Sequence, residues 1–132
     1  MVRVLATVFA AAAALLHVYI FVMESVQWTT PRVWRRFGVT DQGAADTIKP
    51  MAYNQGFYNL FLAIGAIIGI ALVWTGGTDS GTHVAGKTLI LFALGSMVAA
   101  ALVLVTTGAR YVRAALVQGT LPLVGFVLAL FI

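Results

Sequence analysis

The chain alternates between long apolar stretches and short polar connections. Four stretches contain no Asp, Glu, Lys or Arg: residues 4–23, 51–74, 88–109 and 114–132. Each is close to or longer than the roughly 20 residues that an α-helix needs to cross a hydrocarbon core of about 30 Å. Their apolar character is continuous and lacks the alternation of a barrel strand, which predicts helices. We therefore predict an all-α membrane protein, a bundle of four transmembrane helices.

The composition agrees with this class. The 132 residues are 61% hydrophobic and 9% charged, whereas an ordinary soluble domain is roughly 45–50% apolar and roughly 25% charged. The length predicts a single domain over residues 1–132. Cysteine is absent, which removes disulfides, thiolate catalysis and thiolate metal sites. The net charge of +4 comes mainly from connections beside apolar stretches, so it predicts contact with anionic membrane lipids and not with nucleic acid.

The first apolar stretch has a second interpretation. Arg3 and the alanine-rich run after it also resemble the start of a secretory signal peptide. The apolar run continues to Met23 without a small-residue cleavage site after its core. A retained transmembrane helix is therefore the better interpretation.

The connections differ from one another in character. The first, residues 24–50, is polar and aromatic, and it predicts a short helix in the membrane interface. Thr30 and Pro31 have the pattern of an N-cap and a first helical residue, and Gly38 has that of a C-terminal stop. The second, residues 75–87, is rich in Gly and Thr and predicts a flexible loop. The third is a tight turn.

Basic residues are divided unequally between the two sides that four spans create. One side carries Arg32, Arg35, Arg36, Lys49, Arg110 and Arg113, and the other carries Arg3 and Lys87. Basic connections stay in the cytoplasm during insertion. The bias predicts a multi-pass protein of the inner (cytoplasmic) membrane with both termini outside.

Polar side chains gather at one level of the predicted spans. They are His17 and Glu24 in the first span, Asn54, Gln55, Tyr58 and Asn59 in the second, and Gln118 in the fourth. All lie in the halves next to the cytoplasmic connections, whereas the outer halves are almost purely apolar. This distribution predicts a shared polar pocket, open toward the cytoplasm or the inner leaflet. Such a pocket would bind or help move a small or amphipathic ligand.

Other functions fit the same residues. His17 and Glu24 are seven residues apart, which places them on nearly the same face of a helix. They would then exchange protons in an intramembrane enzyme that acts on a lipid or isoprenoid. The third candidate is an accessory or assembly subunit, in which the polar groups only hold helices together. There His17 would form a structural hydrogen bond to Asn59 or Gln118.

Glu24 also has an interpretation without chemistry. It would end the first span in the headgroup region, paired with Arg32 or Arg110. A metal site is not predicted, because one His and one Glu at this spacing are short of the three or four ligands that zinc requires. No cofactor is predicted either.

Small residues recur four positions apart in the spans, as in Gly65 with Gly69. This spacing allows helices to approach closely. Packing among the four helices is the first expectation. A homo-oligomer is the alternative, and transport would require one, because four helices are few for a pathway through a monomer.

A family resemblance covers nearly the whole chain. It is carried by the run from His17 to Glu24, Trp28, Thr30-Pro31, Phe37-Gly38, the stretch Asn54 to Asn59 with Phe61-Leu62-Ala63, and Gln118 ahead of Pro122. The pattern resembles that of small bacterial integral membrane proteins catalogued as a domain of unknown function, numbered 1304. The Asn54 to Asn59 stretch and the His17 to Glu24 spacing are its most specific parts. The family has no settled activity, so the resemblance implies four helices and leaves the chemistry open.

Overall fold

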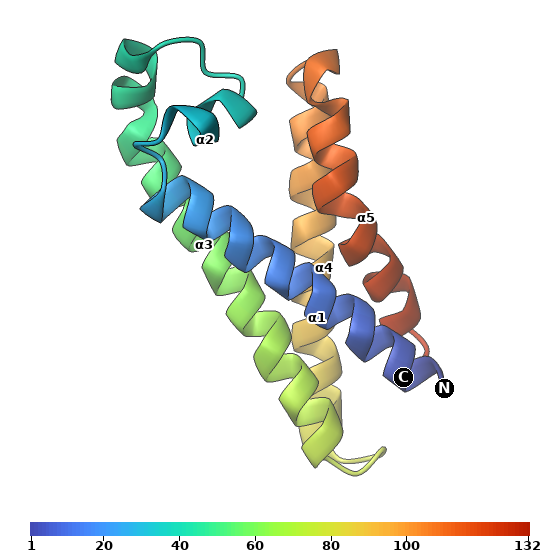
Figure 1. Ribbon diagram of the computed structural model, residues 1–132. Coiled ribbons are helices and arrows are strands. Elements are labelled where there is room, and N and C mark those ends of the chain that lie inside the picture. The colour runs from blue at the N-terminus through green and yellow to red at the C-terminus, as the bar shows by residue number, and fades with distance from the viewer. The chain divides into compact units, whose positions relative to one another are not determined.

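The structure is a computed structural model of residues 1–132, and it is all-helical. Along the chain the elements are α1 (Val2–Phe21), the π-helix η1 (Val22–Val26), α2 (Pro31–Arg36), α3 (Gln42–Thr75), α4 (Gly81–Thr106), the 3-10 helix η2 (Ala109–Tyr111) and α5 (Val112–Ala129) (Figure 1). Four helical segments are long and apolar enough to cross a membrane: Val2–Val26, Gln42–Thr75, Gly81–Thr106 and Ala109–Ala129. The predicted fold class is confirmed.

The chain divides into two compact units. The first unit comprises Met1–Leu16 and Leu62–Ile132, and the second comprises His17–Phe61. The first part of α1 and the second part of α3 therefore pack with α4 and α5. The rest of α1 and α3 belongs with η1, α2 and the first connection.

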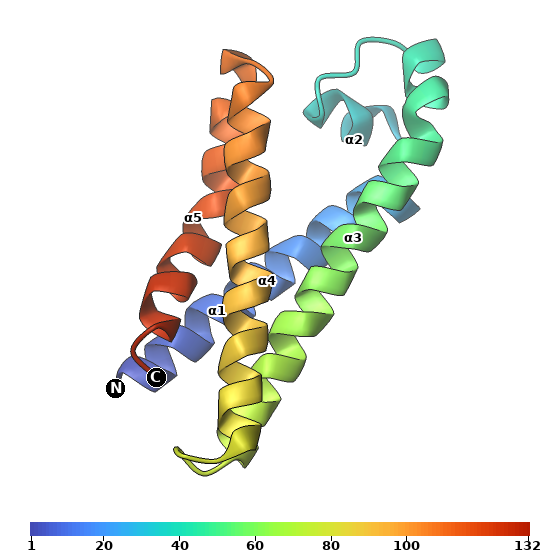
Figure 2. The same ribbon diagram turned by 180° about the vertical axis from the view of Figure 1, so that it is seen from behind.

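The first unit is a bundle of four helical segments around a core of small and aliphatic side chains. Its fully buried members are Ala10, Ala13, Val73, Ile90, Leu94, Met97 and Ala129. Helices α4 and α5 run side by side in both views (Figures 1 and 2). Many partners here are alanines, so the helices approach closely and gain van der Waals contact, which drives helix association in lipid.

Two glycines bring the backbones of α3 and α4 into contact. A Cβ atom added to Gly69 would lie 2.8 Å from the carbonyl oxygen of Gly86, and one added to Gly86 would lie 2.6 Å from the backbone nitrogen of Val73. The expected close packing at Gly69 is confirmed. At Gly65 the added Cβ would be 3.9 Å from the Cβ of Ala93, an ordinary contact.

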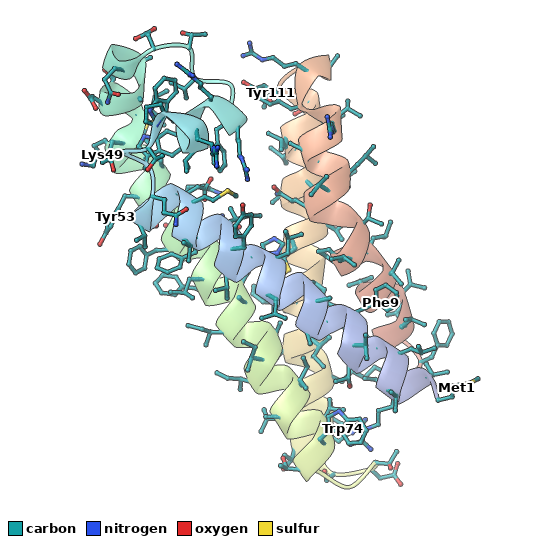
Figure 3. The ribbon with its side chains drawn as sticks, viewed as in Figure 1. Met1, Phe9, Lys49, Tyr53, Trp74 and Tyr111 are labelled. Atoms are coloured by element: carbon teal, nitrogen blue, oxygen red, sulfur yellow. The ribbon has the colours of Figure 1, made fainter.

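Both chain termini lie at the same end of the first unit (Figures 1 and 2). The guanidinium of Arg3 stands over the ring of Trp74 at 4.5 Å from its centroid. The indole nitrogen of Trp74, labelled in Figure 3, donates to Thr7 Oγ1 over 2.8 Å. Lys87 Nζ donates to the backbone oxygen of Ile132 over 2.6 Å. Four helix ends thus meet at this end of the unit: the start of α1, the end of α3, the start of α4 and the end of α5. This follows because successive helices run in opposite directions.

Helix α3 begins nine residues before the start of the predicted span. The predicted start was Met51, but the helix begins at Gln42 and runs through Pro50. Asp41 Oδ1 accepts a hydrogen bond from the backbone nitrogen of Ala44 over 2.9 Å, as an N-cap residue does. A polar helical extension therefore precedes the apolar span, which hydropathy alone does not reveal.

The predicted flexible loop over residues 75–87 is wrong beyond Ser80. Helix α4 begins at Gly81, and Ser80 Oγ accepts from the backbone nitrogen of His83 over 3.1 Å. Several of the glycines and threonines that indicated a loop form the first turns of this helix. The Ser80 side chain makes this possible, because it accepts from a backbone N–H of the first turn that has no partner within the helix. The other ends also shift: the first span continues to Val26, the third ends at Thr106, and the fourth occupies Ala109–Ala129.

The short helix expected in the first connection is present as α2. Thr30 is its N-cap position and Pro31 its first residue, although the Thr30 side chain makes no capping bond. Gly38 follows it with a φ of 79°, a conformation that favours glycine. The backbone nitrogen of Val39 reaches back to the carbonyl oxygen of Trp34 over 3.3 Å, which closes a Schellman motif.

Candidate functional site

Glu24 lies in a widened helical turn at the end of α1. The backbone nitrogen of Gln27 bonds to the carbonyl oxygen of Val22 over 2.9 Å, five residues back, as in a π-helix. Turns of this kind are rare and occur often at functional sites. The extra residue also means that α-helical spacing no longer places Glu24 on the face of His17. Both side chains are nevertheless buried, with exposed fractions of 8% and 1%.

The carboxylate of Glu24 is held by α3. Asn59 Nδ2 donates to Glu24 Oε2 over 2.9 Å and to the backbone oxygen of Gln55 over 3.1 Å. The hydrogen-bond partner of the carboxylate is thus a neutral amide, whereas the interpretation without chemistry had named Arg32 or Arg110. The considered bond of His17 to Asn59 or Gln118 stays a prediction.

A glycine allows α3 to reach this turn. A Cβ atom added to Gly56 would lie 2.1 Å from Ser25 Oγ, 3.1 Å from the Cβ of Glu24 and 3.2 Å from the carbonyl oxygen of Phe21. Ser25 Oγ donates to the backbone oxygen of Tyr53 over 2.8 Å, which fixes the contact. The glycine within the Asn54 to Asn59 stretch therefore brings the π-helical turn and α3 together.

Two aromatic rings form a wall beside the carboxylate. Trp28 is buried, and its indole nitrogen donates to the carbonyl oxygen of Ala45 over 3.0 Å. The ring centroids of Trp28 and Phe37 are 5.4 Å apart, with their planes tilted by 52°. The hydrogen bond ties the first connection to the start of α3 and holds the indole in one place.

These groups enclose an open cavity of about 410 Å³ within the second unit. It is lined by Glu24, Trp28, Phe37, Val39, Ile48, Met51, Ala52, Asn54 and Gln55. Small-molecule sites have volumes of roughly 300–1,000 Å³ and combine apolar walls with a few polar groups. Glu24 is the ionisable group among the nine. Lys49 and Tyr53, labelled in Figure 3, project from the side of α3 away from α2.

The structure brings together part of the predicted polar set. Glu24, Asn54 and Gln55 line the cavity. Asn59 does not line it, but it donates a hydrogen bond to Glu24, which does. Tyr58 has an exposed fraction of 57% and is not part of the lining.

The other two predicted residues lie elsewhere. His17 is buried but does not line the cavity. Gln118 belongs to α5 and thus to the first unit. No group of three or more His, Cys, Asp or Glu side chains is placed to hold a metal ion.

Sequence reasoning missed the apolar and aromatic half of the lining. Trp28 and Phe37 were assigned only to an interfacial connection, and Val39, Ile48 and Met51 were not considered. One signal was available: three aromatic residues, Trp28, Trp34 and Phe37, stand in a connection that is rich in polar residues. The extension of α3 back to Gln42 places Ile48, which lies before the predicted span, on the same helix as Met51.

Four helices of this length and apolarity, with a buried carboxylate beside a cavity, define a small multi-pass α-helical membrane protein. The particular family is shown by a family model, described as "Protein of unknown function (DUF1304)", which matches residues 11–130; the chain belongs to that family. No curated protein and no solved structure was found to match the chain.

Proposed function

We propose that this protein binds, or helps move, a small or amphipathic ligand in the cavity beside Glu24. The cavity of about 410 Å³ is the observation that carries the proposal. Its lining combines one ionisable group with apolar and aromatic side chains. This combination suits a ligand that is itself part polar and part apolar.

The proposal includes an orientation in the inner (cytoplasmic) membrane, with both termini outside and the cavity near the cytoplasmic face. The support is the charge distribution around the cavity. Arg32, Arg35, Arg36 and Lys49 belong to the same compact unit as the cavity. Basic segments of this length remain in the cytoplasm. In this orientation α2 lies at the membrane interface, where anionic lipids meet its arginines.

The enzyme alternative has less support from the geometry. Acid–base chemistry by His17 and Glu24 requires both groups at one cavity, and His17 does not line it. The accessory-subunit alternative explains the bond between Asn59 and Glu24 but leaves the cavity without a role. Ligand binding accounts for both features.

The test uses the whole protein in an uncharged maltoside detergent. Three ten-carbon amphiphiles serve as probes: decyltrimethylammonium, decanol and decanoate, each below its micellar concentration. At least one should raise the unfolding temperature and give saturable heat in titration calorimetry. Met51→Trp should weaken that binding at least tenfold, because Met51 lines the cavity, is 72% exposed, and has room to carry a larger ring across it.

Tyr53→Trp is the matched control. Tyr53 lies on the same helix, is 53% exposed and does not line the cavity, so binding should be unchanged. If no probe binds, or if both tryptophan variants bind as the wild type does, the cavity is not a ligand site and the proposal fails.

A further inference from the structure

We infer that the cavity recognises the ammonium group of an amphipathic amine; this inference rests on the proposed function and names its ligand class. The first argument is that Glu24 is buried without a cationic partner. The residue has an exposed fraction of 8%, and the hydrogen bond to its carboxylate comes from the neutral amide of Asn59. A buried carboxylate without a cationic partner bears a large desolvation cost, which a bound cation offsets. In a transmembrane segment such a group marks a ligand or ion site.

The aromatic wall supplies the second argument. Trp28 and Phe37 line the same cavity as Glu24, and the indole is fixed by its bond to Ala45. The faces of aromatic rings attract cations, most strongly the ring of Trp, and quaternary ammonium groups are recognised in this way. A carboxylate and two aromatic rings that line one cavity therefore match an alkylated ammonium better than a hydroxyl or a carboxylate.

The basic residues of this unit do not offer an anion site in the cavity. Arg36 Nη1 donates to Tyr19 Oη over 2.8 Å. The guanidinium of Arg35 stands over the ring of Trp34, 5.2 Å from its centroid. Arg32 and Lys49 are not part of the lining. An anionic head would thus meet Glu24 with no cation beside it.

The remaining walls define the rest of the ligand. Val39, Ile48, Met51 and Ala52 are apolar and fit an alkyl or aryl substituent. Asn54 and Gln55 also line the cavity, and an amide side chain has an oxygen that can accept from the N–H of a primary or secondary amine. The class is therefore an organic amine, protonated or quaternary, with one apolar substituent.

The same three amphiphiles test the inference, because they share a tail and differ in head-group charge. We expect the wild type to bind decyltrimethylammonium at least tenfold more tightly than decanol or decanoate. Glu24→Gln keeps an oxygen that accepts from Asn59 and removes the charge, so it should reduce the preference over decanol to about twofold or less. Asp46→Asn is the matched control: Asp46 is an exposed carboxylate of the same unit, bonded to Gln42, and its loss should change nothing.

Phe37→Leu provides a second variant that leaves Glu24 in place. It should weaken binding of decyltrimethylammonium several-fold and leave decanol unchanged, because the leucine retains apolar contact and loses the ring face. If Glu24→Gln fails to fold, the amine assignment is tested by two other measurements. These are the relative affinities of the three probes for the wild type and the affinity of decyltrimethylammonium for Phe37→Leu.

The outcomes separate this inference from the proposed function. If decanol or decanoate binds the wild type as tightly as the ammonium and Met51→Trp blocks it, the cavity is a ligand site and the amine assignment is wrong. An ammonium preference that survives in Glu24→Gln also overturns the assignment. If none of the probes binds, both the function and the assignment fall.

Discussion

Asn59 and Glu24, 35 positions apart in the chain, are joined by a buried hydrogen bond of 2.9 Å. The bond connects α3 to the π-helical turn after α1, and it places the carboxylate at the edge of the cavity. Two of the polar residues that the sequence pattern selected are therefore direct partners. Removal of either one acts on the other.

We expect Asn59→Ala to destabilise the protein by about 1 to 3 kcal/mol, the usual cost of leaving a buried polar group without its partner. Asn59→Asp should cost more, because it sets a second carboxylate against Glu24. Unfolding by heat or by dodecyl sulfate in mixed micelles measures the effect. Asn54→Ala, at an exposed position five residues earlier on the same helix, is the control and should have little effect. Equal stability of Asn59→Ala and the wild type would show that the bond has no structural role.

The two buried tryptophans of the second unit should respond differently to the loss of their N–H groups. Trp28→Phe removes the indole hydrogen bond to the carbonyl oxygen of Ala45, which keeps its helical backbone partner, and should cost about 0.5 to 1.5 kcal/mol. The indole nitrogen of Trp34 is buried without a hydrogen-bond partner, so Trp34→Phe removes an unsatisfied donor and should be close to neutral. The unfolding midpoints of the two variants compare them directly. A larger loss in Trp34→Phe than in Trp28→Phe contradicts this geometry.

Two glycines of α3 should give opposite results when replaced by alanine. Gly56→Ala forces a Cβ against Ser25 Oγ and the backbone of Phe21, and overpacking of this kind costs about 1 to 3 kcal/mol. Gly65→Ala meets only an ordinary contact and should stabilise the helix by up to about 1 kcal/mol. Adding Ser25→Ala to Gly56→Ala should recover part of the loss, since it removes the nearest atom. Circular dichroism on heating measures all three.

The N-cap of α3 should be sensitive to acid. The hydrogen bond from the backbone nitrogen of Ala44 holds the pKa of Asp41 below its ordinary value. Because the folded pKa is the lower one, the stabilisation is fully present above the ordinary aspartate pKa and is lost as the pH falls through the lowered pKa. The amide signal of Ala44 in an NMR titration should follow that protonation. In Asp41→Asn the same signal should not move over this acidic range, because the amide does not titrate there.

The orientation can be measured with single cysteines, since the chain has none of its own. Gly77→Cys should react with a membrane-impermeant maleimide added outside cells, and Thr40→Cys should react only after the cells are opened. A side chain at Gly77 projects into open space, so this substitution does not disturb the turn. Labelling with the opposite sidedness would reverse the proposed orientation and place the cavity near the outer face.

The sequence determined the number of spans and the polar residues worth examining. Charged groups are so costly in hydrocarbon that their positions alone bound the four apolar stretches. Local rules also found α2, because a proline at its start and a glycine after its end have effects that depend on few neighbours. Local caps at Asp41 and Ser80 were present in the sequence as well, but their pattern is weak beside hydropathy, so the ends of α3 and α4 were misplaced.

Only the tertiary structure decided which polar residues share a site. The π-helical turn at Val22–Val26 changes the direction of Glu24, and helical spacing from His17 does not account for it. The close approach at Gly56 then puts Asn59 beside that carboxylate, and the indole of Trp28 reaches Ala45 to complete the wall. These contacts join residues 17 to 35 positions apart. They depend on how backbones pack in space, which the order of polar and apolar residues does not specify.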